Sequence, residues 1–226
     1  MDGGQNRVRA HVTPDAGAIT VHAATNRGVF RSFDSGVNWN KFVNGLPPSA
    51  NHDSITIDPQ NTNILYTGAP SGNTNLLYKA TDGGTTWAQA GLPLSNTITS
   101  IFIVGGTVYV ASYGNGLFVS TDNAQTWTNQ NSGTTTAKFL KIAVSPTNAA
   151  NLFLTGENGK VYQSFNAGTT WTALDYRLPA DQDVTGLIVG PDGKTLHIAM
   201  PRDCSSSSGY YQYTINPPVV ATLVDV

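Results

Sequence analysis

The chain has 226 residues, of which 39% are hydrophobic and only 12% are charged, and it carries a formal net charge of −2. This hydrophobic content excludes an intrinsically disordered chain, and the length suits one all-β domain. The slightly acidic balance without a basic run argues against nucleic acid as a partner, and the lack of about 18 consecutive apolar residues argues against insertion into a membrane.

Inner strands are the first element that recurs along the chain. The sequence predicts short strands that end at a Pro or Gly turn at 8–14, 54–59, 99–105, 140–146 and 185–191. Proline ends such a strand because it cannot donate to the hydrogen-bond ladder. A period of about 40 to 50 residues is typical of propellers.

A second strand follows each inner strand and carries an aromatic or His residue at an equivalent place. These residues are separated by steps of 44, 43, 44 and 44, and they are His22, Tyr66, Tyr109, Phe153 and His197. Five strands in register predict five repeat units. We expect His22 and His197 to pack between units rather than to bind a metal, because the equivalent positions are aromatic.

A third strand then leads into an eight-residue turn segment at 32–39, 80–87, 120–127 and 164–171, and the four segments align without gaps. Their characteristic residues are Asp34, Gly36, Trp39, Asp82, Gly84, Trp87, Asp122, Trp127, Asn166, Gly168 and Trp171. A short carboxylate or amide can accept backbone N–H bonds within its own turn, which explains why Asn166 can replace Asp. Glycine permits a positive φ, and the Trp side chains are expected to wedge between adjacent units.

These turn segments resemble the Asp-box, or BNR repeat, of the sialidase-like propellers, whose pattern is Ser-x-Asp-x-Gly-x-Thr-Trp. Sortilin-like and photosystem-assembly-factor-like members of that superfamily recognise proteins or peptides. The resemblance implies an all-β fold, a β-propeller of about five four-stranded blades with Asp-box turns between the third and fourth strands. The blades of this single domain, 1–226, are expected at about 6–45, 46–93, 94–135, 136–180 and 181–226.

The fifth unit departs from the pattern. Tyr210 to Thr214 suits its third strand, but Asn216-Pro217-Pro218 replaces the turn segment, no Trp follows, and 219–226 is the expected outer strand. We therefore expect a monomer if the ring closes on itself. If it does not close, the chain is expected to be an oligomer or part of a longer propeller.

No metal, cofactor or catalytic residue is predicted. Each turn segment offers at most one carboxylate, which argues against a calcium cluster. Cys204 is the only cysteine, which excludes a Cys-based metal site and an intrachain disulfide. Sialidases use an arginine triad whose first member typically precedes Ile-Pro, and no Arg-Ile-Pro occurs here. Xyloglucan-cleaving hydrolases place paired carboxylates between two seven-bladed domains, and this chain has neither that length nor an evident pair.

Ligand binding is expected at the loops around one mouth of the central channel, which connect second to third strands and one blade to the next. Their side chains form a mixed set that suits sugar hydroxyls or a protein loop, and that equally suits ordinary solvated loops. The candidates are Arg27, His52, Tyr113, Asn115, Glu157, Asn158, Arg202 and Asp203.

The preferred functional hypothesis is a non-enzymatic binding or scaffold propeller that recognises a protein or a glycan. One alternative is a carbohydrate-active protein, either a glycan-binding module or a partial or degenerate glycoside hydrolase. Another is a truncated or engineered propeller without a ligand. The low charge content favours an extracellular or periplasmic location, and the first nine residues lack the apolar core of a secretory signal.

Overall fold

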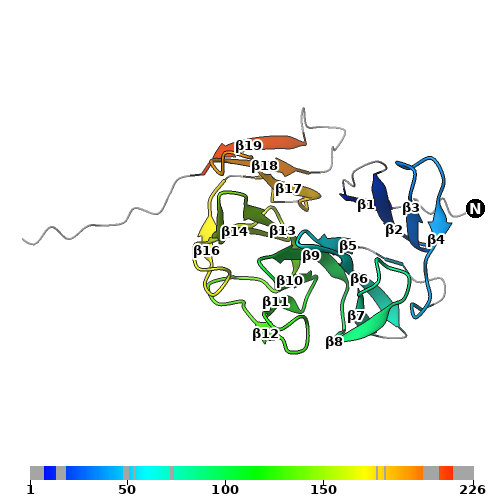
Figure 1. The fold of residues 1–226 in the computed structure, drawn as a ribbon. Coiled ribbons are helices and arrows are strands. Elements are labelled where there is room, and N and C mark those ends of the chain that lie inside the picture. The colour runs from blue at the N-terminus through cyan, green and yellow to red at the C-terminus, as the bar shows by residue number, and fades with distance from the viewer. Residues whose placement is uncertain are drawn as a thin grey trace, which may run out of the picture.

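A computed structural model describes residues 8–13, 19–47, 51–52, 54–71, 74–176, 178–180, 182–200 and 209–215. Within these ranges the protein is an all-β, propeller-like domain made of antiparallel sheets (Figure 1). Four of the sheets have four strands and the last has three. The predicted all-β propeller architecture is confirmed at this level, whereas the number of blades in the complete molecule stays a prediction.

The strands follow the chain from one sheet to the next. The first sheet contains β1 (Val8–Thr13), β2 (Thr20–Thr25), β3 (Gly28–Ser32) and β4 (Asn40–Lys41). The second contains β5 (Ser54–Asp58), β6 (Asn61–Ser71), β7 (Thr74–Ala80) and β8 (Ala88–Leu94). The third contains β9 (Ile98–Val104), β10 (Thr107–Ser112), β11 (Gly116–Ser120) and β12 (Thr128–Asn129). The fourth contains β13 (Phe139–Ser145), β14 (Asn148–Gly156), β15 (Val161–Ser164) and β16 (Thr172–Leu174), and the fifth contains β17 (Gly186–Val189), β18 (Thr195–Ala199) and β19 (Tyr210–Thr214).

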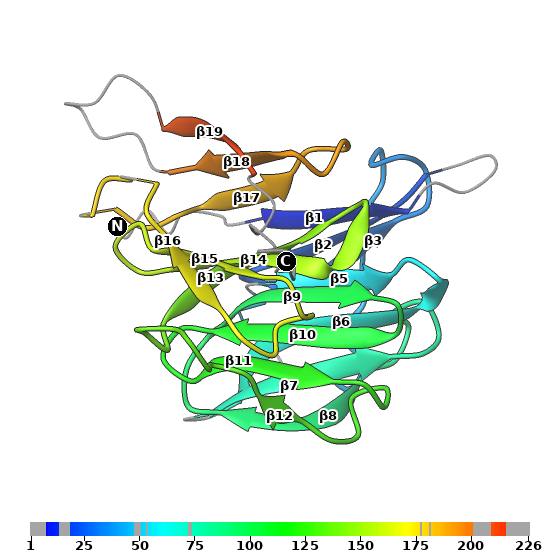
Figure 2. The ribbon, with the colours of Figure 1, turned by 90° about the vertical axis from the view of Figure 1, so that its left-hand side faces the viewer.

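Each sheet is a meander in which strands pair in chain order. The inner strands contact one another in the order β1, β5, β9, β13 and β17, so the sheets succeed each other around a common centre (Figure 1). In the view turned by 90°, the strands run across the molecule and their connections lie at two opposite rims (Figure 2). One rim carries the loops between second and third strands, and the other carries the turns between third and fourth strands.

The core consists of four clusters, one between each pair of successive sheets. Val29 of the first sheet packs with Leu65 of the second, and Leu77 of the second packs with Val110 of the third. The remaining two clusters join the third to the fourth sheet and the fourth to the fifth. Middle strands such as β10 are buried along almost their whole length, because neighbouring sheets cover both of their faces. Burying each large apolar side chain contributes about 1.5–3 kcal/mol.

In the four turns between third and fourth strands, which we call the repeat turns, the Asp or Asn side chain accepts a hydrogen bond from the backbone N four residues later. In three of the turns a Ser two residues earlier also donates to this side chain, whereas the second turn has Ala80 at that place. In the first of them, Ser32 Oγ donates to Asp34 Oδ1 at 2.7 Å and accepts from Gly36 N at 2.8 Å. Asp34 Oδ1 also accepts from Asn38 N at 2.8 Å. This bond from the Asn38 backbone is the main reason that the pKa of Asp34 falls to about 2, helped by bonds from the Asn38 and Ser32 side chains. The turn is thus stabilised locally, without help from another sheet.

The Trp residues of the repeat turns link each sheet to the preceding one. Trp127 Nε1 donates to Ala90 O and Trp171 Nε1 donates to Gln130 O, both at 3.1 Å. Trp87 is 5% exposed, and its backbone N donates to Asn44 O at 2.9 Å. Trp39 differs, because it is 42% exposed and its Nε1 donates to Gly36 O within its own turn. The first sheet therefore presents an indole to solvent, whereas Trp87 and Trp171 are buried and Trp127 is partly buried.

The strand positions agree closely with those predicted from the sequence. The five inner strands begin and end within one or two residues of their predicted ranges, and β19 spans the predicted Tyr210–Thr214. The outer strand predicted at 219–226 lies outside the described residues. Within the described ranges, β1 and β17 contact each other less extensively than any two consecutive inner strands do.

Candidate functional site

The rim of second-to-third strand loops brings Tyr113 and Glu157 together around a lysine. Tyr113, in the β10–β11 loop, pairs with Lys138 in an isolated antiparallel bridge. Lys138 Nζ lies 5.5 Å from the centre of the Tyr113 ring and 2.9 Å from Glu157 Oε2. Glu157 follows β14, and its backbone N donates to Lys138 O at 3.1 Å. Three segments from the third and fourth sheets thus form one continuous surface, which we call the Tyr113 surface.

The charges of the Tyr113 surface are mutually stabilised. The hydrogen bond from Lys138 lowers the pKa of Glu157, and the same bond raises the pKa of Lys138. Thr136 Oγ1 donates to the other carboxylate oxygen, Glu157 Oε1, at 3.3 Å. Both pKa shifts favour the charged forms of the two side chains, Lys138 and Glu157. Tyr113 is 36% exposed, so its ring is accessible beside this ion pair.

Asn158 extends the Tyr113 surface toward the fifth sheet. Its backbone has a positive φ of 59°, and its N–H donates to Asp183 Oδ1 at 3.3 Å. Asp183 lies just before β17, and its charge helps to raise the pKa of Lys138. Polar groups from three consecutive sheets are therefore available at this part of the rim.

Asn115 is the fourth predicted candidate in this region, and its side chain is used within the loops. Its Oδ1 accepts from Asn96 N at 2.9 Å, and its Nδ2 donates to Ser95 Oγ at 3.0 Å. Ser112 Oγ also donates to Asn115 Oδ1, at 3.3 Å. These bonds hold the loop that precedes β9 against the β10–β11 loop, so Asn115 positions the backbone beside Tyr113.

Two further predicted candidates, Arg27 and His52, belong to the first and second sheets rather than to the Tyr113 surface. Arg27 is exposed in the β2–β3 loop, where its backbone N donates to Thr25 Oγ1 at 3.0 Å. His52 is only 3% exposed, and its Nδ1 lies 3.2 Å from Thr67 Oγ1. Arg202 and Asp203 lie outside the described residues.

Lys138 and Asp183 were not among the residues selected from the sequence. Lys138 directly precedes β13, and Asp183 lies three residues before β17. A charged residue within three residues of the start of an inner strand is the signal that could have identified them, since that position faces the same rim as the second-to-third strand loops.

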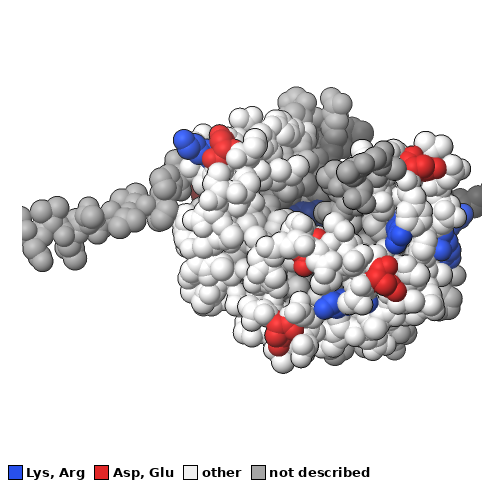
Figure 3. Space-filling view, viewed as in Figure 1, with Lys and Arg blue, Asp and Glu red and all other residues white. Residues whose placement is uncertain are grey.

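On the face seen in Figure 3, charged side chains are few, scattered and of both signs. Among the described residues, no group of three or more His, Cys, Asp or Glu side chains could hold a metal ion. The same part of the chain contains no helix that is long and apolar enough to cross a membrane.

The fold and this rim define a propeller-like β protein whose loop face carries an accessible aromatic ring beside an ion pair. More particularly, the chain belongs to the DUF6242 beta propeller domain family, whose model matches residues 34–189.

Among known proteins, the chain is similar to a xyloglucanase of Hypocrea jecorina (strain QM6a), with 30% identity over 156 residues. The match covers 66% of this chain and 17% of the xyloglucanase. A xyloglucanase of Acetivibrio thermocellus is 27% identical over 170 residues, which is 70% of this chain and 18% of that protein. The chain thus spans less than one fifth of the length of these curated relatives.

Two solved structures share the fold. The GH74 xyloglucanase from Xanthomonas campestris superposes with a TM-score of 0.69 at 14% identity, over 92% of this chain and 38% of that one. A structure described as YCF48 bound to D1 peptide superposes with a TM-score of 0.62 at 16% identity, over 88% of this chain and 62% of that one. At these identities the likeness concerns the fold.

Proposed function

We propose that this protein is a glycan-binding propeller module whose Tyr113 surface contacts the sugar and which does not cleave it. The observation that carries the proposal is the accessible Tyr113 ring beside the Lys138–Glu157 ion pair. A sugar ring has C–H groups on its faces and hydroxyls at its edge, so it can stack on an aromatic ring while charged groups bind its hydroxyls. The similarity to xyloglucanases supports a β-glucan chain with xylose branches as the ligand.

The absence of cleavage is argued from the state of Glu157. Glycoside hydrolysis generally needs one carboxyl group that is protonated near neutral pH and a second carboxylate at a fixed distance. The hydrogen bond from Lys138 lowers the pKa of Glu157, which disfavours the protonated form. Glu157 therefore suits hydrogen bonding to a sugar better than proton donation to a leaving group.

The test is calorimetric titration of the full chain with xyloglucan oligosaccharides, together with an assay for reducing-sugar release. We expect binding without release. Tyr113→Ala should weaken binding about tenfold, the size expected for one stacked aromatic ring, whereas Tyr113→Phe should retain it. Trp39→Ala is the matched control, because Trp39 is an exposed aromatic residue on the opposite rim.

Two results would contradict the proposal. Sugar release that Glu157→Gln abolishes would assign the protein as a glycoside hydrolase. Unchanged affinity of Tyr113→Ala would remove the Tyr113 surface as the binding site.

A peptide ligand is the second candidate, because the structural neighbour YCF48 is described as bound to a peptide. The same titration distinguishes the two, since a peptide-binding module would leave the oligosaccharides unbound.

The number of blades and the identity of the repeat turns are part of the proposal. We infer a five-bladed unit whose repeat turns are Asp-boxes. Support comes from the hydrogen-bond pattern that Asp34, Asp122 and Asn166 share with their Ser partners two residues earlier.

A further inference from the structure

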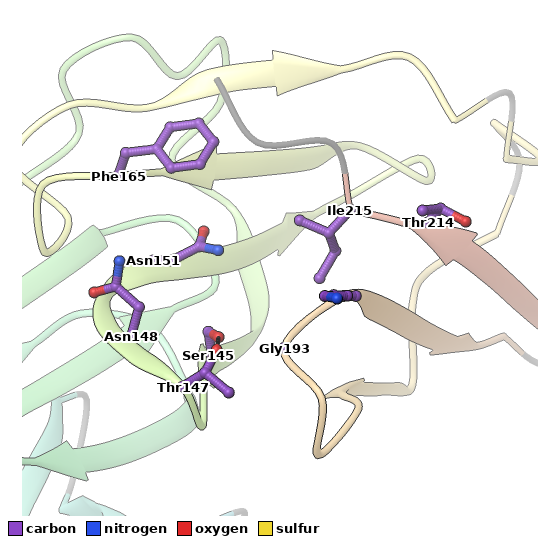
Figure 4. A pocket seen from close by; sticks show the side chains of 9 residues that line it. Ser145, Thr147, Asn148, Asn151, Phe165, Gly193, Thr214 and Ile215 are labelled. Carbon is purple, nitrogen blue, oxygen red and sulfur yellow. Dashed lines mark hydrogen bonds between the residues drawn. The ribbon is translucent and has the colours of Figure 1, made fainter. Parts of the chain in front are cut away.

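A cavity lies on the rim opposite the Tyr113 surface, between the fourth and fifth sheets. The cavity has a volume of about 530 Å³ and is open to solvent (Figure 4). Phe165, from the repeat turn of the fourth sheet, and Asn151 of β14 line one side. Gly193, in the β17–β18 turn, and Ile215, directly after β19, line the other. The size is that of a site for a small ligand.

The hollow lies at the one junction where the following sheet lacks the repeat-turn sequence. At the third-to-fourth junction, Tyr109 Oη donates to Ala167 O in the next repeat turn at 3.2 Å. In the fifth sheet, Ile215 N donates to Lys194 O at 2.7 Å, which continues the β18–β19 pairing one residue beyond Thr195 and Thr214. After Ile215 the sequence continues as Asn-Pro-Pro and contains no later Trp.

The floor of the cavity is a close contact between two turns. Gly193 has a φ of +68°, and a Cβ built on it would overlap Thr147 Oγ1. Ser145 Oγ lies 3.1 Å from Thr147 Oγ1, so a pair of hydroxyls sits below the glycine. Only glycine, which has no side chain, allows the β17–β18 turn to approach Thr147 this closely. Ser145 and Thr147 both line the cavity.

The walls combine an apolar ring with a fixed amide. Phe165 is 38% exposed and supplies a flat apolar surface. Asn151 is 9% exposed, and its Oδ1 accepts from Gln163 Nε2 at 2.9 Å, which fixes the orientation of the amide. Figure 4 shows the Asn151 side chain and Ile215 extending toward the same space from opposite sides. No Asp or Glu is among the described residues that line the cavity, and Lys194 is its one charged residue.

From these contacts we propose that the cavity is a second binding site, for one or two rings of a neutral saccharide. A flat ring for stacking, an oriented amide and a pair of hydroxyls match the C–H faces and hydroxyl edges of a sugar. The lack of a carboxylate and the single lysine disfavour a cationic ligand, and one lysine without a second cationic side chain is a poor match for a multiply charged anion. The site is separate from the Tyr113 surface and does not depend on it.

The test is an NMR titration of the full chain with cellobiose, observing backbone amides. We expect shifts in residues 145–151 and 193–194. Phe165→Ala should weaken this binding at least about fivefold. Phe165→Trp should retain it, because either aromatic ring can stack on the sugar. Phe33→Ala is the matched control, since Phe33 occupies the same place in the first repeat turn and is 46% exposed. The amide spectrum of each variant reports whether it is folded.

The outcomes separate this site from the Tyr113 surface. Shifts around 145–151 that persist in Tyr113→Ala support the cavity even if the Tyr113 surface binds nothing. Shifts confined to the neighbourhood of Tyr113, an unchanged affinity in Phe165→Ala, or no shift with cellobiose would overturn the proposal. Equal weakening by Phe33→Ala would overturn it too, because the effect would then not be local.

Discussion

His52 is a polar residue that the fold removes from water. Its backbone N donates to Thr25 O of the first sheet at 3.0 Å, and its Nδ1 faces Thr67 Oγ1 of the second. Its Nε2 has no hydrogen-bond partner among the described residues. Burial disfavours the charged imidazolium and, with a smaller effect from Lys41, lowers the pKa of His52 to about 4.

Because His52 is buried, we expect the protein to be less stable at acidic pH than at neutral pH. The unfolded chain has a histidine pKa of about 6.5, so between about pH 6.5 and pH 4 it binds a proton that the folded protein does not bind. The free energy of unfolding should therefore fall as the pH drops through this range, by up to about 3 kcal/mol. Urea unfolding of the wild type and His52→Gln at pH 7, 5.5 and 4.5 measures it. An equal pH dependence in both proteins would show that His52 is not the cause.

The aspartates of the repeat turns act in a different pH range. Because the pKa of Asp34 is about 2, the stability it contributes is present above an unfolded pKa of about 3.9 and is lost only as the pH falls toward 2. The two effects can consequently be separated in one pH series.

The Trp residues act at the scale of the element, since they connect a repeat turn to the preceding sheet. Trp171 is 4% exposed, packs in the core between the third and fourth sheets, and donates to Gln130 O. Trp39 has the same position in its turn but is 42% exposed. The same position in the repeat turn is thus buried between two sheets in the fourth sheet and partly exposed in the first.

Substitution of the two Trp residues should therefore have unequal effects. Trp171→Ala should lower the free energy of unfolding by about 3–5 kcal/mol, because it leaves a cavity and removes a hydrogen bond. Trp39→Ala should cost less than about 1 kcal/mol, as expected for an exposed side chain. Urea unfolding measures both. Similar losses would mean that Trp39 is buried against another sheet in solution.

At the scale of the whole molecule, the described residues form apolar clusters between successive sheets. Among these residues, the second, third and fourth sheets each pack between two clusters, whereas the first and fifth sheets each contribute to one. In repeat architectures stability is approximately a sum of unit and interface terms. The end sheets should consequently open more easily than the middle ones.

Amide hydrogen exchange tests this order. Protection should be highest in β10 and β14 and lower in β2 and β18, measured on the full chain at neutral pH. If β2 and β18 were protected as strongly as β10 in a protein with the mass of one chain, the first and fifth sheets would have to pack together, as in the predicted closed ring. Equal protection in a larger assembly would indicate packing between copies.

The sequence by itself determined the repeat and its local structure. The spacing of His22, Tyr66, Tyr109, Phe153 and His197 located the second strands, and the Asp and Trp positions located the turns. These features can be predicted because strand burial and turn hydrogen bonds depend on residues within about eight positions of each other. Tyr113 and Glu157 were predicted as candidate site residues for the same reason, since both lie in loops that the repeat defines.

Only the tertiary structure decided how the units meet. It placed Lys138 between Tyr113 and Glu157, buried His52, exposed Trp39 and opened a cavity beside Phe165. Each of these depends on the orientation of one sheet relative to the next. Local patterns do not encode that orientation, because the packing of large side chains between whole sheets sets it.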